Sequence, residues 1–175
     1  MPDIADLVEE DLLNAAITSD EWLIESGTDV VKVAPLCWYH VRICAITKPQ
    51  AHLAGPVRVV SEYPNIAAGF ASAHWDNQFT QRTVHGAVEE YLPDLADVAV
   101  ECVETGENVR RRGLVVMETL FEADVWLVCS QQVAQDTETV DRLRTWASAI
   151  AEPERSGCPS WPDAPAAPGR RKLLR

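Results

Sequence analysis

The segment from Leu95 to Leu114 combines a strand pattern, a Thr-Gly turn and a helix pattern, which together suit it to bind an anion. Acidic and small apolar residues alternate from Asp97 to Cys102, the chain turns through Glu104-Thr105-Gly106, and a helical pattern continues to Gly113. The first amides of a helix lack intrahelical partners, and the helix dipole adds partial positive charge there. Glycine lets the backbone approach a ligand closely. The alternative is a plain turn, which Thr-Gly after a strand forms more often.

Other chemistries find little support in the sequence. The five cysteines form no Cys-x-x-Cys pair, and the nearest ligand-like spacing, Cys37 with His40, lacks the residues that complete a zinc site, so we expect no metal centre. The four histidines follow no catalytic spacing. A nucleophile elbow of the Ser-His-Asp or Cys-His kind is also missing.

The net charge of −12 excludes two classes of partner. Nucleic acids and acidic membranes are bound by Lys and Arg that neutralise phosphate, and this chain is strongly acidic. Because the sequence has neither a run of eighteen apolar residues nor a basic start leading into an apolar stretch, we expect no membrane span, no secretory signal and a cytoplasmic location.

Apolar periodicity, caps and breakers predict alternating strands and helices, which is the pattern of an α/β protein with a mainly parallel sheet. The closing helix is well marked by a cap at Asp136 or Thr137 and by a stripe of apolar residues. Ser19 is a predicted N-cap and Gly27 a predicted helix stop. The predicted helices are Asp3–Asn14, Asp20–Ser26, Pro64–Ala73, Gly86–Tyr91 and Asp136–Ala151, and the predicted strands are Ala15–Thr18, Val30–Ala34, Val41–Thr47, Val57–Ser61, Gln78–His85, Leu114–Phe121 and Val125–Cys129.

Several motifs in fixed order resemble ATP phosphoribosyltransferase, the first enzyme of histidine biosynthesis. The resemblance covers roughly residues 3–130, and a set of ordered motifs is more specific than any one of them. The motifs are Glu25-Ser26-Gly27-Thr28-Asp29-Val30-Val31 within Asp3–Ile46, then Val57–Ala67, Val84–Pro93, the Leu95–Leu114 segment and Leu114–Val128.

This resemblance implies a two-lobed fold similar to type II periplasmic binding proteins, with the ligand in a cleft between the lobes. The first lobe, shortened, would comprise residues 1–44 and 116–151, and the second lobe residues 45–115. Residues 152–175, rich in proline, alanine and arginine, are expected to be a flexible tail.

The resemblance also assigns candidate site residues. The Thr-Gly loop would hold a sugar 5-phosphate, with Asn108 in place of a second threonine and Glu107 adding a negative charge. Tyr63 would pack on a purine or, equally, fill the core at a strand–helix junction. Glu89 would face the cleft or lie on a solvated helix face. The candidate ligand-binding residues are Tyr63, Asn65, Thr105, Gly106, Glu107 and Asn108, and the candidate catalytic residues are Glu89, Asp97, Glu101 and His85.

The sequence departs from the family in ways that bear on activity. Glu101 stands where aspartate is usual, Ala16–Ser19 replaces a turn with glycine at both ends, and the family's opening strand and helix with Lys, Gly and Arg would lie upstream of Met1. We therefore favour a diverged transferase of the glycosyltransferase (phosphoribosyl) type that acts on a different small molecule in a specialised biosynthetic pathway. The alternatives are a genuine ATP phosphoribosyltransferase that needs a partner chain, and a non-catalytic binding or regulatory subunit.

The implied partners follow from these hypotheses. A phosphorylated substrate would bring magnesium with it, and any other substrate would require no cofactor. We expect a small-molecule ligand and either a homo-oligomer, such as a dimer, or a partner subunit.

Overall fold

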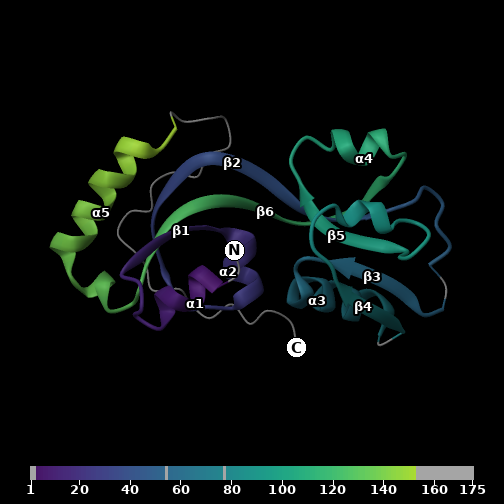
Figure 1. Ribbon diagram of the computed structural model, residues 1–175, viewed down its shortest axis with the longest axis horizontal. Coiled ribbons are helices and arrows are strands. Elements are labelled where there is room, and N and C mark those ends of the chain that lie inside the picture. Colours follow the sequence, from purple (N-terminus) through teal and green to yellow (C-terminus); the bar gives the residue numbers. More distant parts are fainter. Residues whose placement is uncertain (1–2, 54, 77, 153–175) are drawn as a thin grey trace. The chain divides into compact units, whose positions relative to one another are not determined.

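The computed structural model describes residues 3–53, 55–76 and 78–152, and it divides the chain into two compact units. Unit 1 comprises Met1–His40 and Asp124–Arg175, and unit 2 comprises Val41–Ala123. Two long strands, β2 (Val31–Thr47) and β6 (Val115–Cys129), carry the chain from one unit into the other (Figure 1). The predicted tail lies outside the described residues apart from Glu152.

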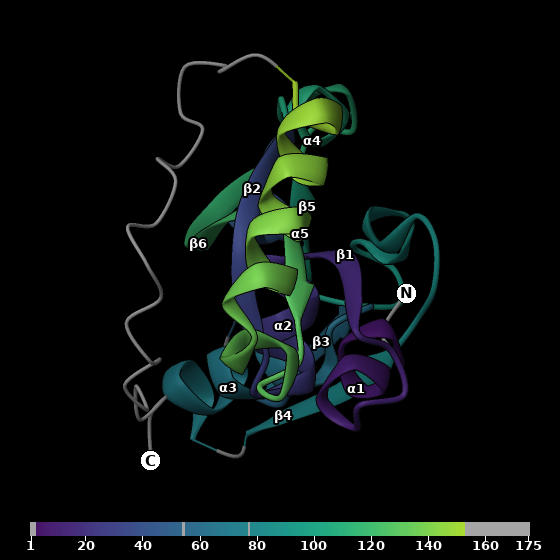
Figure 2. The same cartoon turned by 90° about the vertical axis from the view of Figure 1, so that its left-hand side faces the viewer.

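Unit 1 packs helices on both faces of a short antiparallel sheet. β1 (Ala15–Ser19) pairs with the end of β6, Ala15 opposite Cys129 and Ser19 opposite Val125. One face packs against α5 (Thr137–Ile150), through Leu127 and Val140, and Figure 2 shows this helix lying along the strands. The other face packs against α1 (Asp3–Glu9) and α2 (Asp20–Ser26).

Unit 2 contains the parallel part of the sheet. β3 (Val57–Ser61) lies between β4 (Phe79–Thr83) and β5 (Val98–Val103) and runs parallel to both. β5 also pairs antiparallel with the second half of β2. The connections are α3 (Pro64–Trp75), the 3-10 helix η1 (Val88–Tyr91) and α4 (Glu107–Arg111), and in unit 1 a second 3-10 helix, η2 (Val133–Gln135), precedes α5.

The α/β class is confirmed, with a mixed sheet in the order β1-β6-β2-β5-β3-β4. A crossover connection is needed between parallel neighbours, and α3 provides it between β3 and β4. The two crossing strands pair antiparallel with β1 and β5. Within the described residues, no helix is both long and apolar enough to cross a bilayer.

The crossing strands correct two sequence predictions. We expected two strands within 30–47 and two within 114–129, because polar or aromatic residues such as His40 and Glu122 interrupt the apolar runs. The structure instead continues each strand through the interruption. Burial changes there: the first five residues of β6 are exposed and its last seven are buried. Backbone pairing therefore continues where the side-chain pattern breaks.

The helix caps were predicted with mixed success. Gly27 adopts the left-handed conformation at the end of α2, with φ 69°, as predicted for a helix stop. Asp136 caps α5, its carboxylate accepting from the amides of Glu138 and Thr139. Ser19 is the N-cap residue of α2, as predicted, but its side chain forms no cap hydrogen bond. The first helix ends at Glu9 rather than Asn14.

An ion pair between Arg58 and Asp97 fastens the start of β5 to β3. Asp97 Oδ2 accepts from the Arg58 backbone amide at 2.8 Å and from Nε at 3.1 Å, and Oδ1 accepts from Nη2 at 2.7 Å. The guanidinium also donates to the carbonyls of Asp94 and Pro93. Hydrogen bonding to Arg58 lowers the pKa of the Asp97 carboxyl.

We predict that Asp97→Ala destabilises the protein by about 1–2 kcal/mol at pH 7, because it removes charge-assisted hydrogen bonds from a partly exposed pair. A lowered carboxyl pKa contributes stability above the unfolded value near 4, and that stability is lost as the pH falls. The difference in melting temperature between variant and parent should therefore shrink as the pH falls below about 4 and through the lowered pKa of Asp97. Asp94→Ala is the matched control, since it retains the carbonyl that Arg58 contacts; an equal loss in both variants would contradict the prediction.

Candidate functional site

The Thr-Gly loop connects β5 to the five-residue helix α4, and its own contacts hold its shape. Gly106 has φ 70°, the left-handed region that favours glycine, and a Cβ there would stand 3.4 Å from Arg110 Nη1. The Glu107 amide donates to Thr105 Oγ1 at 3.3 Å, and Arg110 Nη1 donates to the Thr105 carbonyl at 3.2 Å. Thr105, Glu107 and Asn108 are exposed, so their side chains are accessible to a ligand.

Two carboxyl groups meet beside this loop. Glu89 belongs to η1 and is only 8% exposed, while Glu101 belongs to β5, three residues before Glu104. Within the described residues, the Oε2 atom of each side chain is buried and has no hydrogen-bond partner. If both carboxyls were ionised, these two oxygens would have no donor. The two side chains are nevertheless within hydrogen-bonding reach of one another. A single proton held between them resolves both observations, because a protonated carboxyl donates to an ionised one.

Burial chiefly, and then the charge and hydrogen bond of Glu89, raise the pKa of Glu101 to about 8. Glu62 adds a smaller electrostatic contribution in the same direction. The physical cause is that two carboxylates this close cannot both ionise cheaply in a half-buried position. At neutral pH the pair therefore retains one proton and can donate or accept it.

Arg112 is the cation that contacts this acidic group. Its Nε lies 3.4 Å from Glu89 Oε1, and its guanidinium also donates to the exposed Glu90. Hydrogen bonding to Glu90 raises the pKa of Arg112 and lowers that of Glu90. In the sequence, the basic run Arg110–Arg112 could either compensate acidic groups near the loop or form a solvated face, and the structure directs Arg112 to the glutamates.

The other predicted catalytic residues contact other partners. The Asp97 carboxylate is held by Arg58. His85 Nδ1 lies 3.8 Å from Glu62 Oε1, with its side chain 85% exposed. Glu62 Oε1 also accepts from the Gly86 amide at 2.8 Å. The structure thus brings Glu89 and Glu101 together, with Glu62 electrostatically coupled to Glu101.

Tyr63 and Asn65 lie at the start of α3. Tyr63 is 5% exposed, and its amide donates to Ser61 Oγ at 2.9 Å, while the Ser61 hydroxyl donates to the Val100 carbonyl at 2.7 Å. This burial favours the interpretation of Tyr63 as a core residue at a strand–helix junction. Asn65 is exposed.

Two contributors were not identified from the sequence, because Glu62 and Arg58 are far in sequence from their partners. The only local signal was Arg58 itself, a charged residue inside the apolar strand VRVVS. Within the described residues, no group of three or more His, Cys, Asp or Glu has a geometry that could hold a metal ion.

The chain has a two-unit α/β fold like that of periplasmic binding proteins, crossed twice between its units, with a Thr-Gly loop after β5. The chain belongs to the ATP phosphoribosyltransferase family, whose profile matches residues 1–151.

Curated relatives carry the same name. ATP phosphoribosyltransferase of Chlorobium chlorochromatii (strain CaD3) is 27% identical over 155 residues, which cover 83% of this chain and 52% of that protein. The enzyme of Alkaliphilus metalliredigens (strain QYMF) is 29% identical over 133 residues, which cover 74% of this chain and 63% of that protein. The chain therefore spans about half to two-thirds of the length of the relatives it matches.

Solved structures share the fold. The ATP phosphoribosyl transferase (HisG:HisZ) complex from Thermotoga maritima matches with a TM-score of 0.78 at 15% identity, covering 85% of this chain and 75% of that one. The P235GK mutant of ArgBP from T. maritima matches with a TM-score of 0.52 at 10% identity, covering 86% and 68% of the two chains.

Proposed function

We propose that this chain is a diverged member of its family, a phosphoribosyltransferase-type enzyme that binds a small anionic molecule at the Thr105–Asn108 loop and acts in a specialised biosynthetic pathway. The observation that carries the proposal is the pairing of Glu89 with Glu101 beside the loop, where the Oε2 atom of each is buried without a hydrogen-bond partner and burial raises the pKa of Glu101. The loop offers hydroxyl and amide donors from Thr105 and Asn108, and the pair offers a proton at neutral pH.

The charge at this site restricts the substrate. Glu107 and Glu104 are exposed on the loop, and Glu62 and Glu90 lie near the carboxyl pair, with Arg112 as the opposing cation. A ligand with several phosphates would meet repulsion that one guanidinium does not offset. The site is better suited to a ligand with a single phosphate or carboxylate, or to one whose phosphates arrive with bound magnesium.

A second candidate is ATP phosphoribosyl transfer in complex with a partner chain. It is favoured by the structural match to a protein solved as a two-component complex. A non-catalytic binding or regulatory subunit is the third candidate, and it predicts ligand binding without turnover.

Two assays on the full chain separate these candidates. The diverged enzyme predicts no phosphoribosyl-ATP from ATP, phosphoribosyl pyrophosphate and magnesium, alone or with a partner chain. It also predicts a thermal shift from one of a panel of sugar monophosphates and monocarboxylates, with turnover of that ligand. A ligand at a hundred times its dissociation constant stabilises by about 2.7 kcal/mol. Formation of phosphoribosyl-ATP near about 1 per second would establish the second candidate instead.

The ligand assignment is tested by Thr105→Val combined with Asn108→Ala. Each lost neutral hydrogen bond is worth about 0.5–1.5 kcal/mol, so the double variant should bind the stabilising anion roughly five- to a hundredfold more weakly. Isothermal titration of parent and variant measures the change. Thr80→Val, at an exposed position of β4, is the matched control. Unchanged affinity in the double variant would place the anion elsewhere.

A further inference from the structure

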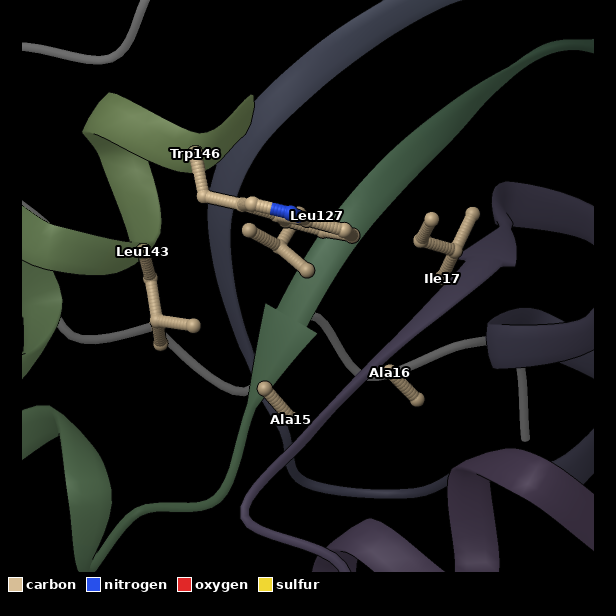
Figure 3. Close-up of a pocket in the computed structure, with 6 residues that line it drawn as sticks. All are labelled: Ala15, Ala16, Ile17, Leu127, Leu143 and Trp146. Atoms are coloured by element: carbon tan, nitrogen blue, oxygen red, sulfur yellow. The ribbon is translucent and has the colours of Figure 1, made fainter. Parts of the chain in front are cut away.

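The apolar hollow of unit 1 and the charged cluster of unit 2 offer different kinds of chemistry. The hollow encloses about 410 Å³ between α5, β6 and β1, and Figure 3 shows that aliphatic side chains and Trp146 line it. Among the described residues, none that lines it is charged, so it has no group that would hold a proton. In unit 2, charged residues from four segments of the chain meet beside the Thr-Gly loop: Glu62, Glu89, Glu90, Glu101 and Arg112.

The strand β5 directs Glu101 toward the apolar packing of unit 2. Alternate residues of a strand point to the same face, so Glu101 shares a face with Ala99 and Val103. Those two residues pack in one buried cluster with Val88 of η1 and Val109 of α4. The Glu101 carboxyl therefore lies on the face of β5 that η1 and α4 cover, and burial there is the main cause that raises its pKa to about 8.

The turn that ends α4 holds the backbone of Arg112 in place. The Leu114 amide donates to the Val109 carbonyl and the Gly113 amide donates to the Arg110 carbonyl, both at 2.9 Å. These two bonds form the Schellman pattern of helix ends, and the apolar contact that accompanies it is present because Val109 and Leu114 pack in the same buried cluster. Arg112 lies between these two anchored residues.

The guanidinium of Arg112 distinguishes the two carboxyls of the pair. Its Nε lies 3.4 Å from Glu89 Oε1, and within the described residues no ion pair joins it to Glu101. Hydrogen bonding to Glu90 does most to raise the pKa of Arg112, and the charge of Glu89 then contributes more than that of Glu101. A negative charge is therefore stabilised better on Glu89 than on Glu101, which lies in apolar surroundings. A protonated Glu101 can donate to Glu89, and this also satisfies the buried Oε2 atoms.

The other charges nearby leave this order unchanged. After burial and the neighbouring carboxyl, the charge of Glu62 also raises the pKa of Glu101. Glu62 Oε1 itself lies 3.8 Å from Nδ1 of the exposed His85. Glu90 is exposed and pairs with Arg112. A hydrogen bond with the backbone of the neighbouring glutamate lowers the pKa of Glu101, but by less than burial raises it.

We propose that Arg112 is a positioning residue that assigns the roles within the carboxyl pair: it holds the negative charge on Glu89, so that Glu101 carries the shared proton and is the proton donor of the site. The catalytic meaning of this assignment rests on the function proposed above, whereas the protonation states are measured without a ligand. Failure of an anion to bind would therefore overturn that function and not the role of Arg112.

The test is carbon-13 NMR of the full chain with labelled glutamate carboxyls, titrated with acid and base around neutral pH. Glu89→Gln and Glu101→Gln assign the two resonances. In the parent, the Glu101 resonance should change with a midpoint near pH 8, while the Glu89 resonance keeps the position of a carboxylate through that transition. In Arg112→Gln, the pH at which the pair takes up its second proton should rise by about one unit, because an opposite charge at this distance shifts carboxyl titration by about 1–3 units.

Three further variants complete the design. Arg112→Lys retains the charge and should titrate like the parent, whereas Arg112→Met is a second neutral variant and should titrate like Arg112→Gln. Arg111→Gln is the matched control, because it removes the same charge from the exposed neighbouring position. A merely structural role for Arg112 would lower the melting temperature of the neutral variants without moving the proton titration.

Three results would overturn the proposal. They are a parent in which the Glu89 resonance carries the upper transition, neutral variants of Arg112 that titrate like the parent, and an equal shift in Arg111→Gln. If neither neutral variant folds, the parent decides through the resonance that changes near pH 8.

Discussion

Asp20→Ala will destabilise unit 1 by about 3 kcal/mol, because the Asp20 carboxylate satisfies several donors from other elements. Oδ2 accepts from the Asp124 amide and from Trp126 Nε1, both at 3.0 Å, and Oδ1 pairs with Lys32 Nζ. The carboxylate is largely buried, with 13% of its side chain exposed. Alanine would leave the Asp124 amide and the indole nitrogen without an acceptor.

Thermal unfolding measures this loss. For a chain of this size, 1 kcal/mol corresponds to about 2–4 °C, so the melting temperature should fall by about 6–12 °C. Asp20→Asn retains a side-chain oxygen for one donor but not the charge opposite Lys32, so it should lose roughly half as much. Asp6→Ala, an exposed acidic residue of α1, is the control and should change the melting temperature by less than about 2 °C. Equal melting temperatures for Asp20→Ala and Asp6→Ala would refute this role.

The sequence predicted the elements that depend on local chemistry. Asp20–Ser26 and Val57–Ser61 were predicted with the bounds they have, since Gly27 ends the first and Pro64 soon follows the second. Asp136 or Thr137 was predicted as the cap of α5, and the structure has Asp136. These signals act within a few residues of chain and do not depend on the rest of the fold.

The contacts between distant residues were not predictable in this way. Glu89 and Glu101 were separate candidates, and only the packing of η1 on β5 makes them a pair. Asp97 was a catalytic candidate because of its motif position, and its ion pair with Arg58 spans 39 residues of sequence. The strands β2 and β6 are longer than predicted for another reason: backbone pairing continues where polar side chains indicated a break.

Glu101→Gln will stabilise the protein at pH 8.5 and leave its stability nearly unchanged at pH 5. The pKa of Glu101 is raised from 4.5 to about 8 by burial and by Glu89, so between these values the unfolded chain ionises while the folded chain retains the proton. Proton uptake then favours the folded state at low pH, and stability falls as the pH rises from about 4.5 to 8. Glutamine removes this dependence and donates to Glu89 in place of the shared proton.

The difference between the unfolded and folded pKa values of Glu101 limits the gain in unfolding free energy at pH 8.5 to about 5 kcal/mol. Because the group is partly exposed, solvent screening reduces the expected gain to about 2 kcal/mol, which corresponds to about 4–8 °C in melting temperature. Melting curves of parent and variant from pH 5 to pH 8.5 measure it directly. Glu90→Gln is the matched control, because the pKa of that neighbouring exposed carboxylate is lowered by Arg112 and its titration lies below this window. Glu90→Gln should therefore shift the melting temperature equally at both pH values. If the Glu101→Gln and parent curves run parallel from pH 5 to 8.5, the two carboxyls do not share a proton, and the acid–base role assigned to the pair fails with it.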